Sequence, residues 1–245
     1  MNVAIIGSGG REHALSYKIK DSELLDRLYI IPGNPGTINL GENINLDIND
    51  HAAVVNFCKG KDIELVVIGP EQPLEKGLAD VLRDNEIKVF GPGKEAAKIE
   101  SSKSFAKSIM KTAEVPTAKY LKFTNTMYDH AKDYLKGKKY PCVIKADGLA
   151  AGKGVYICNN PEEAKKAIKD IFVSKVFGSA GDNVLIEEYL EGEEASVFAI
   201  TDGDNFVCLP PSQDHKRIGE NDTGKNTGGM GAYAPTPFVN DELME

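Results

Sequence analysis

The first 95 or so residues alternate short apolar runs with amphipathic stretches, and this rhythm constrains the fold more than any other feature. The apolar runs resemble strands and occupy 3–6, 28–31, 65–68 and 88–90, and the helix-like stretches lie near 11–20, 50–59 and 74–85. Such alternation is typical of βαβ units, in which helices connect parallel strands. The sequence therefore predicts an α/β protein that begins with an open parallel sheet.

Turn-forming residues follow each of the four predicted strands. The turn segments are Gly7–Gly10, Pro32–Gly36, Gly69–Glu71 and Gly91–Gly93. Because ligands of open parallel sheets gather at the carboxyl ends of the strands, we expect these turns to form one shared crevice. This crevice is the first candidate binding site of the chain.

The first of these turns is similar to the dinucleotide fingerprint G-x-G-x-x-G without matching it. Glu12 stands where the last glycine is required, and Pro32 rather than an acidic residue follows the second predicted strand. These departures argue against NAD binding. Backbone binding of a phosphate at the start of the next helix, beside Arg11, is the favoured role. The alternative is a tight turn that serves only the packing of strand against helix.

The pattern changes after residue 117. A helix rich in lysine, glutamate and serine is expected over 94–112, and Pro116 follows it. Further strands are predicted at 120–123, 141–145, 154–158 and 184–188, with helices at 126–137 and 161–174. This spacing favours antiparallel hairpins with helices on one side, which is a small α+β lobe. The remainder predicts a strand pair (195–201 and 206–209), a long polar loop (212–232) and the start of a helix (240–244).

A segment rich in lysine and glycine, Lys145–Val155, follows the apolar run 142–144. Glycines let backbone amides approach phosphate oxygens closely, and the lysines add positive charge. The segment lacks the G-x-x-x-x-G-K-[ST] spacing of a P-loop, because Gly154 follows Lys153. It indicates phosphate binding, and the competing interpretation is a hairpin turn with solvated lysines.

An acidic segment, Val184–Glu194, follows about forty residues later. Where this strand changes direction, the backbone of Glu188 and Leu190 can meet an adenine edge, and Glu194 can hold ribose hydroxyls. The alternative is an acidic strand end on the surface. Together with the glycine-rich segment, it predicts a nucleoside triphosphate held between two sheets.

The polar segment from Ser212 to about Ala232 mixes acidic, basic and glycine residues. Long loops within compact folds are often functional. Asp214 can hold an ammonium group, and Lys216 or Arg217 a phosphate or a carboxylate. The alternative is a flexible surface loop without a role in binding.

Composition excludes several classes of function. The formal net charge is −8 and the pI about 5.2, which argues against a nucleic-acid binder but not against small anionic ligands. The four cysteines form no CxxC pair and the four histidines no HExxH motif, so we expect reduced thiols, a cytoplasmic location and no zinc site. The first apolar run is too short for a signal peptide or a membrane span.

Seven segments resemble, in order, the phosphoribosylamine–glycine ligases (glycinamide ribonucleotide synthetases) of the ATP-grasp superfamily. They span essentially the whole chain: Gly7–His13, Pro32–Thr37, Gly69–Glu71, Lys145–Val155, Ile186–Ser196, Ser212–Arg217 and Asp222–Tyr233. The resemblance implies a Rossmann-like (pre-ATP-grasp) substrate domain over 1–100 and a linker helix with the ATP-grasp small lobe over 101–192. Residues 193–245 would then begin the second ATP-grasp lobe.

The resemblance also implies a reaction. The carboxylate of glycine attacks the γ-phosphate of ATP to give glycyl phosphate, which the amine of 5-phosphoribosylamine then attacks. The products are glycinamide ribonucleotide, ADP and phosphate, in de novo purine biosynthesis. The implied partners are therefore these small molecules, with neither nucleic acid nor membrane, and the implied assembly is a monomer or dimer.

Three groups of site residues follow from the resemblance. ATP would be held by Lys103, Lys145, Gly148, Gly152, Lys153, Gly154, Glu187, Glu188, Leu190 and Glu194, with 147–154 as a mobile lid. The phosphoribosylamine crevice would be lined by Gly9, Gly10, Arg11, Asn34, Gly36, Thr37, Pro70 and Glu71. The catalytic group would be Asp214, Lys216 and Arg217, with Asp214 placing glycine or the amine.

The sequence departs from the family pattern at the metal site. The family's ligands for Mg²⁺ or Mn²⁺ lie in a Glu-Phe-Asn-x-Arg-Phe-Gly-Asp-Pro-Glu-like segment expected beyond residue 245, so no residue here is assigned to the metal. Without it the charges on ATP are poorly neutralised, which predicts that these 245 residues alone are inactive. A smaller departure is Lys225, where the family usually has proline. Two alternatives stay open: another ATP-grasp carboxylate–amine ligase, and a non-catalytic nucleotide-binding fragment.

Overall fold

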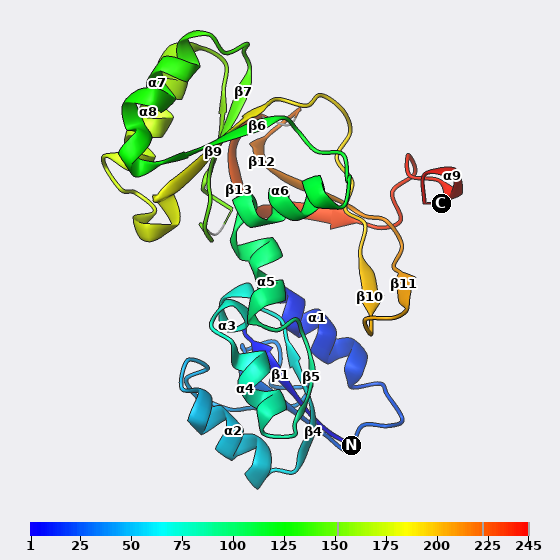
Figure 1. Ribbon diagram of the computed structural model, residues 1–245. Coiled ribbons are helices and arrows are strands. Elements are labelled where there is room, and N and C mark those ends of the chain that lie inside the picture. Colours follow the sequence, from blue (N-terminus) through cyan, green and yellow to red (C-terminus); the bar gives the residue numbers. More distant parts are fainter. Residues whose placement is uncertain (151, 222, 245) are drawn as a thin grey trace. The chain divides into compact units, whose positions relative to one another are not determined.

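The structure is a computed structural model that describes residues 1–150, 152–221 and 223–244 (Figure 1). Two residues of the matching segments, Ala151 and Asp222, lie outside the described residues. The chain divides into two compact units, Met1–Val115 and Pro116–Glu245. Among the described residues, no helix has the length and apolar character needed to cross a membrane.

The N-terminal unit is built on a five-stranded parallel sheet, as the sequence predicts, with strand order β3-β2-β1-β4-β5. The strands are β1 (Asn2–Gly7), β2 (Arg27–Pro32), β3 (Glu42–Asn43), β4 (Ile63–Ile68) and β5 (Lys88–Phe90). The helices are α1 (Gly10–Ile19), α2 (His51–Gly60), α3 (Glu71–Glu75), α4 (Leu78–Asp84), α5 (Lys94–Ser101) and α6 (Lys103–Thr112). Both faces of the central strands are buried, because Ile5 and Ile6 point to opposite faces and neither is exposed.

Two helices that the sequence predicts as continuous are each broken in the structure. The helix expected over 74–85 divides into α3 and α4 at Gly77, whose φ of +86° lies in the left-handed region that a helix interior cannot hold. The helix expected over 94–112 divides into α5 and α6 at Ser102. The Ser102 hydroxyl accepts a hydrogen bond of 3.2 Å from the Phe105 amide and thereby caps the second helix.

The C-terminal unit contains a four-stranded antiparallel sheet with strand order β6-β9-β7-β8. Its strands are β6 (Tyr120–Thr124), β7 (Cys142–Ala146), β8 (Val155–Cys158) and β9 (Asn183–Glu188). The helical elements are η1 (Asn125–Met127), α7 (Tyr128–Lys136), α8 (Pro161–Phe172) and η2 (Gly178–Gly181). Helices α7 and α8 lie together on one side of the sheet (Figure 1). This arrangement confirms the predicted α+β lobe.

The core of this unit lies between the two helices and one face of the sheet. Leu135 of α7 and Ile168 of α8 pack with Ile144 and Ile186 of the sheet, and all four are fully buried. Helix α8 begins where the Asn160 side chain accepts a 3.0 Å hydrogen bond from the Glu163 amide. The opposite face of the sheet is thereby left to other residues, which carry the candidate site.

The remaining residues form two antiparallel hairpins and a short helix. The first hairpin pairs β10 (Ala199–Thr201) with β11 (Phe206–Cys208), so the strand predicted from 195 begins four residues later. The second pairs β12 (Gln213–Gly219) with β13 (Thr223–Tyr233), and α9 (Asp241–Met244) follows. The loop predicted over 212–232 is therefore wrong. The segment folds as a hairpin because its strands pair with each other through their backbones, which requires no apolar run.

All four cysteines are free thiols, and only Cys208 is exposed. Burial raises the pKa of the Cys58 thiol to about 11. We expect one thiol per chain to react rapidly with an aromatic disulfide reagent at pH 8, and the other three to react only in denaturant. Replacement of Cys208 with serine should abolish the rapid phase. Rapid reaction of more than one thiol would contradict this burial pattern.

Candidate functional site

The sheet of the C-terminal unit places two charged residues on the face turned away from α7 and α8. Lys145 lies opposite Leu185 on β9 and Val155 on β8, and Glu187 lies opposite Val143 on β7. Since side chains alternate along a strand, these residues share the face that Ile144 and Ile186 do not use. The predicted ATP residues Lys145 and Glu187, 42 positions apart in sequence, are thus brought onto one surface.

Lys145 and Glu187 form a diagonal ion pair across β7 and β9. The Lys145 Nζ lies 2.8 Å from Glu187 Oε2, and the side chains are 29% and 3% exposed, respectively. Diagonal neighbours on one sheet face are within reach of long side chains. The buried carboxylate therefore fixes the position of an ammonium group that still reaches the surface. Such a group can bind an anionic ligand without first having to be ordered.

The segment after β7 is held by backbone hydrogen bonds to residues 180–183. The Asp147 amide donates to the Asn183 carbonyl and the Gly148 amide to the Ala180 carbonyl, both at 3.0 Å. A Cβ atom on Gly148 would lie 2.8 Å from the Ala180 Cα atom. The absence of a side chain at Gly148 therefore permits close packing against Ala180. Lys153 is exposed, so its ammonium group is available to a phosphate.

The predicted adenosine residues at the end of β9 and beyond it have different surroundings. The Glu188 carboxylate accepts a hydrogen bond of 2.8 Å from the Lys119 amide, and the Glu188 amide donates to the Lys119 carbonyl at 3.0 Å. Leu190 is exposed, whereas Glu194 binds the Lys216 Nζ at 2.7 Å. The structure therefore joins Glu194 to the predicted catalytic group rather than to Glu188. An adenine edge would have to meet backbone groups of this segment other than the Glu188 amide.

The predicted catalytic residues of β12 are divided between two environments. The Lys216 Nζ bonds Glu194 Oε1 at 2.7 Å and Asp214 Oδ1 at 3.0 Å. Burial alone would lower the pKa of Lys216, but the bonds to these two carboxylates outweigh it and raise the pKa. Asp214 and Lys216 are thus held together, with Lys216 as a cation at neutral pH.

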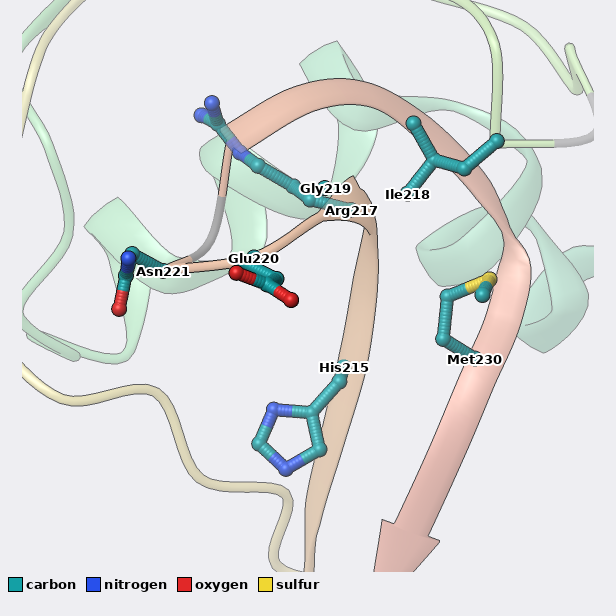
Figure 2. Close-up of a pocket in the computed structure, with 7 residues that line it drawn as sticks. All are labelled: His215, Arg217, Ile218, Gly219, Glu220, Asn221 and Met230. Atoms are coloured by element: carbon teal, nitrogen blue, oxygen red, sulfur yellow. The ribbon is translucent and has the colours of Figure 1, made fainter.

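Arg217 instead lines a cavity of about 330 Å³ at the closed end of the β12–β13 hairpin. Figure 2 shows the side chains of Arg217, Glu220 and Asn221 on the left of the cavity and the apolar side chains of Ile218 and Met230 on the right. The remaining lining residues are His215 and Gly219. The sequence named only Arg217 among these. Register shifts between His215, Arg217 and Gly219 interrupt the regular pairing of this strand, so no local sequence pattern indicates the other lining residues.

In the N-terminal unit, side chains at the strand ends connect the turns that form the predicted substrate crevice. The Asn34 Nδ2 donates to the Ser8 carbonyl at 3.0 Å, and its Oδ1 accepts from the Gly36 amide at 2.8 Å. Asn34 therefore joins the turn after β2 to the turn after β1. Thr37 is fully buried, with its hydroxyl bonded to the Asn34 carbonyl at 2.8 Å and Asn43 Oδ1 at 2.7 Å, so it supports the turn from within.

Arg11 joins α1 to the turn after β4. Its guanidinium donates to the Gly69 carbonyl at 2.5 Å and to Glu71 Oε1 at 2.9 Å. Burial opposes ionisation of Glu71, but a backbone hydrogen bond and the Arg11 guanidinium outweigh it and lower the pKa of this carboxyl. Gly9, Gly10 and Pro70 flank these groups in sequence. The structure thus brings the eight predicted substrate residues to the carboxyl ends of β1, β2 and β4.

Two further predictions concern Lys103 and the metal ion. Lys103 is the first residue of α6 in the N-terminal unit, whereas the other predicted ATP residues belong to the C-terminal unit. Within the described residues, no group of three or more His, Cys, Asp and Glu side chains could hold a metal ion. The structure therefore offers no metal-binding set to combine with the candidate ATP residues in the part it describes.

Comparison with known families decides the assignment. Residues 1–100 match the N domain of phosphoribosylglycinamide synthetase, and residues 101–245 match its ATP-grasp (A) domain. The chain belongs to this family. The two matches cover the whole chain, and the second includes the sheet that carries Lys145 and Glu187.

Members of the phosphoribosylglycinamide synthetase family are closely similar to the chain. It is 51% identical to the phosphoribosylamine–glycine ligase of Agrobacterium fabrum over 245 residues, which cover 100% of the chain and 57% of the relative. The ligase of Haemophilus influenzae is 48% identical over 99% of the chain and 57% of its own length. The chain therefore spans somewhat more than half the length of the curated relatives it matches.

Solved structures agree with the family assignment. The phosphoribosylamine–glycine ligase of Thermotoga maritima superposes with a TM-score of 0.81 at 35% identity, over 98% of this chain and 56% of that one. The biotin carboxylase domain of a Hydrogenobacter thermophilus 2-oxoglutarate carboxylase, solved with MgADP, has a TM-score of 0.68 at 20% identity, over 92% and 51%. At that identity the second likeness shows the fold alone, which the synthetase family shares with other ATP-grasp proteins.

Proposed function

We propose that these residues belong to a phosphoribosylamine–glycine ligase, which joins glycine to 5-phosphoribosylamine at the expense of ATP in purine biosynthesis. The observation that carries the proposal is the family match over the whole chain, including the sheet with the Lys145–Glu187 pair. In this function the N-terminal unit binds the phosphorylated amine, and residues 101–192 and 193–245 contribute to the ATP site. The reaction takes place in the cytoplasm, on a monomer or dimer.

The candidate residues have separate tasks in the reaction. Lys145 and Lys153, with Lys103, neutralise the phosphates of ATP, while Gly148, Gly152 and Gly154 shape the segment that covers them. Glu187, Glu188, Leu190 and Glu194 hold adenosine. The Asp214–Lys216 pair and Arg217 place the glycine and stabilise the charge that develops on the acyl phosphate. Positioning and charge neutralisation are the main contributions of a protein to phosphoryl transfer.

The chemistry consists of two displacements. A carboxylate oxygen of glycine attacks the γ-phosphorus and ADP leaves, and the amine of 5-phosphoribosylamine then attacks the glycyl carbonyl carbon as phosphate leaves. Mg²⁺ or Mn²⁺ supplies further charge neutralisation in the complete reaction. The described residues contain no cluster of three or more His, Cys, Asp and Glu side chains that could hold such an ion. We propose that its ligands belong to the part of the relatives that these 245 residues do not match.

The test is ADP release from MgATP, with glycine and freshly generated phosphoribosylamine each present or withheld. We expect little release by the 245 residues alone and substrate-dependent release when they are joined to the unmatched part of the Agrobacterium fabrum ligase. Release by the joined protein without glycine, or release over many turnovers without the amine, would contradict the proposed reaction. ATP binding without any release by the joined protein would instead support a nucleotide-binding module.

A further inference from the structure

Glu12 is a buried acidic residue at a position where many parallel-sheet proteins place glycine. It lies in the first turn of α1 and is only 4% exposed. Its Oε2 accepts a hydrogen bond of 2.6 Å from the Gly9 amide. A backbone amide at the start of a helix is a group that anionic ligands commonly use, and here the protein's own carboxylate uses it.

Three glycines make room for the Glu12 side chain. A Cβ atom on Gly7 would lie 2.6 Å from the Glu12 Cδ atom, and one on Gly9 would lie 3.0 Å from its Oε2. A Cβ atom on Gly69 would overlap Glu12 Oε1 outright. Gly7 ends β1 and Gly69 follows β4, so the carboxylate occupies the space between the ends of these two strands.

This space is the topological switch point of the sheet. In the order β3-β2-β1-β4-β5 the chain extends to one side from β1 and to the other from β4. Open α/β sheets bind their ligands in the crevice at this point, and dinucleotide-binding members place the pyrophosphate there. In this chain the Glu12 side chain fills that crevice instead.

We propose that Glu12 determines the specificity of this crevice, because its side chain occupies the Gly9 amide and the space between Gly7 and Gly69 and so excludes diphosphates. A ligand at this edge of the sheet instead meets the Arg11–Glu71 pair, whose side chains are 58% and 42% exposed. This second statement rests on the proposed function. The exclusion itself does not, because it depends only on how Glu12 packs.

The packing is tested by combining Gly69→Ala with Glu12→Ala and measuring thermal unfolding. Gly69 has no left-handed φ, so alanine adds no backbone strain there and its effect reports on Glu12. We expect Gly69→Ala to lower the Tm clearly in the wild-type protein and much less in the Glu12→Ala protein. Gly10→Ala is the control, because a Cβ atom there meets nothing within 4 Å. An equal effect of Gly69→Ala in both proteins would overturn the proposed packing.

Specificity is tested by calorimetric titration with inorganic pyrophosphate and with NAD⁺. Glu12→Gly completes the spacing G-x-G-x-x-G, and we expect it to bind pyrophosphate at least about tenfold more tightly than the wild type does. Glu12→Gln keeps the volume and can still accept from the Gly9 amide, so we expect it to bind as weakly as the wild type. A folded Glu12→Gly protein with no gain, or an equal gain in Glu12→Gln, would overturn exclusion by occupancy.

A substitute variant and a second ligand separate a failure of folding, or of the proposed function, from a failure of the proposed exclusion. If Glu12→Gly does not fold, Glu12→Ala takes its place in the titration, with the same expected gain over Glu12→Gln. Ribose 5-phosphate, titrated into the wild-type protein, reports on the proposed substrate crevice independently of Glu12. Failure of that binding with gain of pyrophosphate binding in the variant would count against the proposed function alone.

Discussion

Replacement of Lys145 with methionine should weaken ATP binding by about 10- to 100-fold, since a hydrogen bond to a charged group contributes about 1.5–3 kcal/mol. Methionine keeps most of the length and apolar volume of the side chain but removes its ammonium group. That group is fixed by Glu187 at 2.8 Å and reaches the surface of the sheet face proposed to hold the nucleotide. The affinity is measured by isothermal titration calorimetry with MgATP.

Lys165→Met is the matched control for this prediction. Lys165 lies on α8, on the other side of the same sheet, and forms an exposed ion pair with Glu162 at 2.8 Å. We expect its loss to leave ATP affinity unchanged, because the charge is remote from the candidate face and screened by solvent. Equal weakening by both replacements would show only a general effect of positive charge, and no weakening by Lys145→Met would reject its role.

Replacement of Ile144 with alanine should lower the free energy of unfolding of the C-terminal unit by about 2–5 kcal/mol. Ile144 is fully buried on β7, a central strand, and faces the core that α7 and α8 cover. Its truncation removes apolar burial and leaves a cavity that neighbouring side chains fill only in part. Since the chain has no tryptophan, urea unfolding is followed by circular dichroism or tyrosine fluorescence.

Leu121→Ala provides the comparison on the same sheet. Leu121 lies on the edge strand β6 and is 48% exposed, so we expect a change within about 0.5 kcal/mol. Because Leu121 pairs with Ile186 and so lies on the same sheet face as Ile144, a loss as large as that of Ile144→Ala would mean that the cost of truncation does not follow burial. A small effect at Ile144 would mean that α7 and α8 do not form the core of this unit.

Sequence patterns predicted those elements whose formation depends on apolar burial. Strands β1, β2 and β4 are buried on both faces and therefore appear as continuous apolar runs. The two-residue strand β3 is too short to leave such a pattern. The β12–β13 hairpin consists mostly of polar residues and glycine, so no regular alternation of apolar and polar residues revealed it.

For the candidate sites, the sequence suggests residues but not how those residues are arranged. Lys145 and Glu187 were named from separate segments, and only the register of β7 with β9 places them on one face. Thr37 was expected to line the crevice, but its burial makes it a support for the turn. Glu12 was noted as a departure from a glycine pattern, and its packing against Gly7 and Gly69 gives the physical reason for that departure. Contacts between distant segments decide such roles, and local sequence does not contain them.

The most direct test of the nucleotide-binding face is methyl NMR of the labelled protein during titration with MgATP. Val143, Val155 and Leu185 lie on the face of the sheet that carries Lys145, and Ile144 and Ile186 lie on the face that packs against α7 and α8. The account predicts saturable shifts of the first group with little change in the second. Shifts confined to the second group, equal shifts in both, or no saturable shift at all would contradict it.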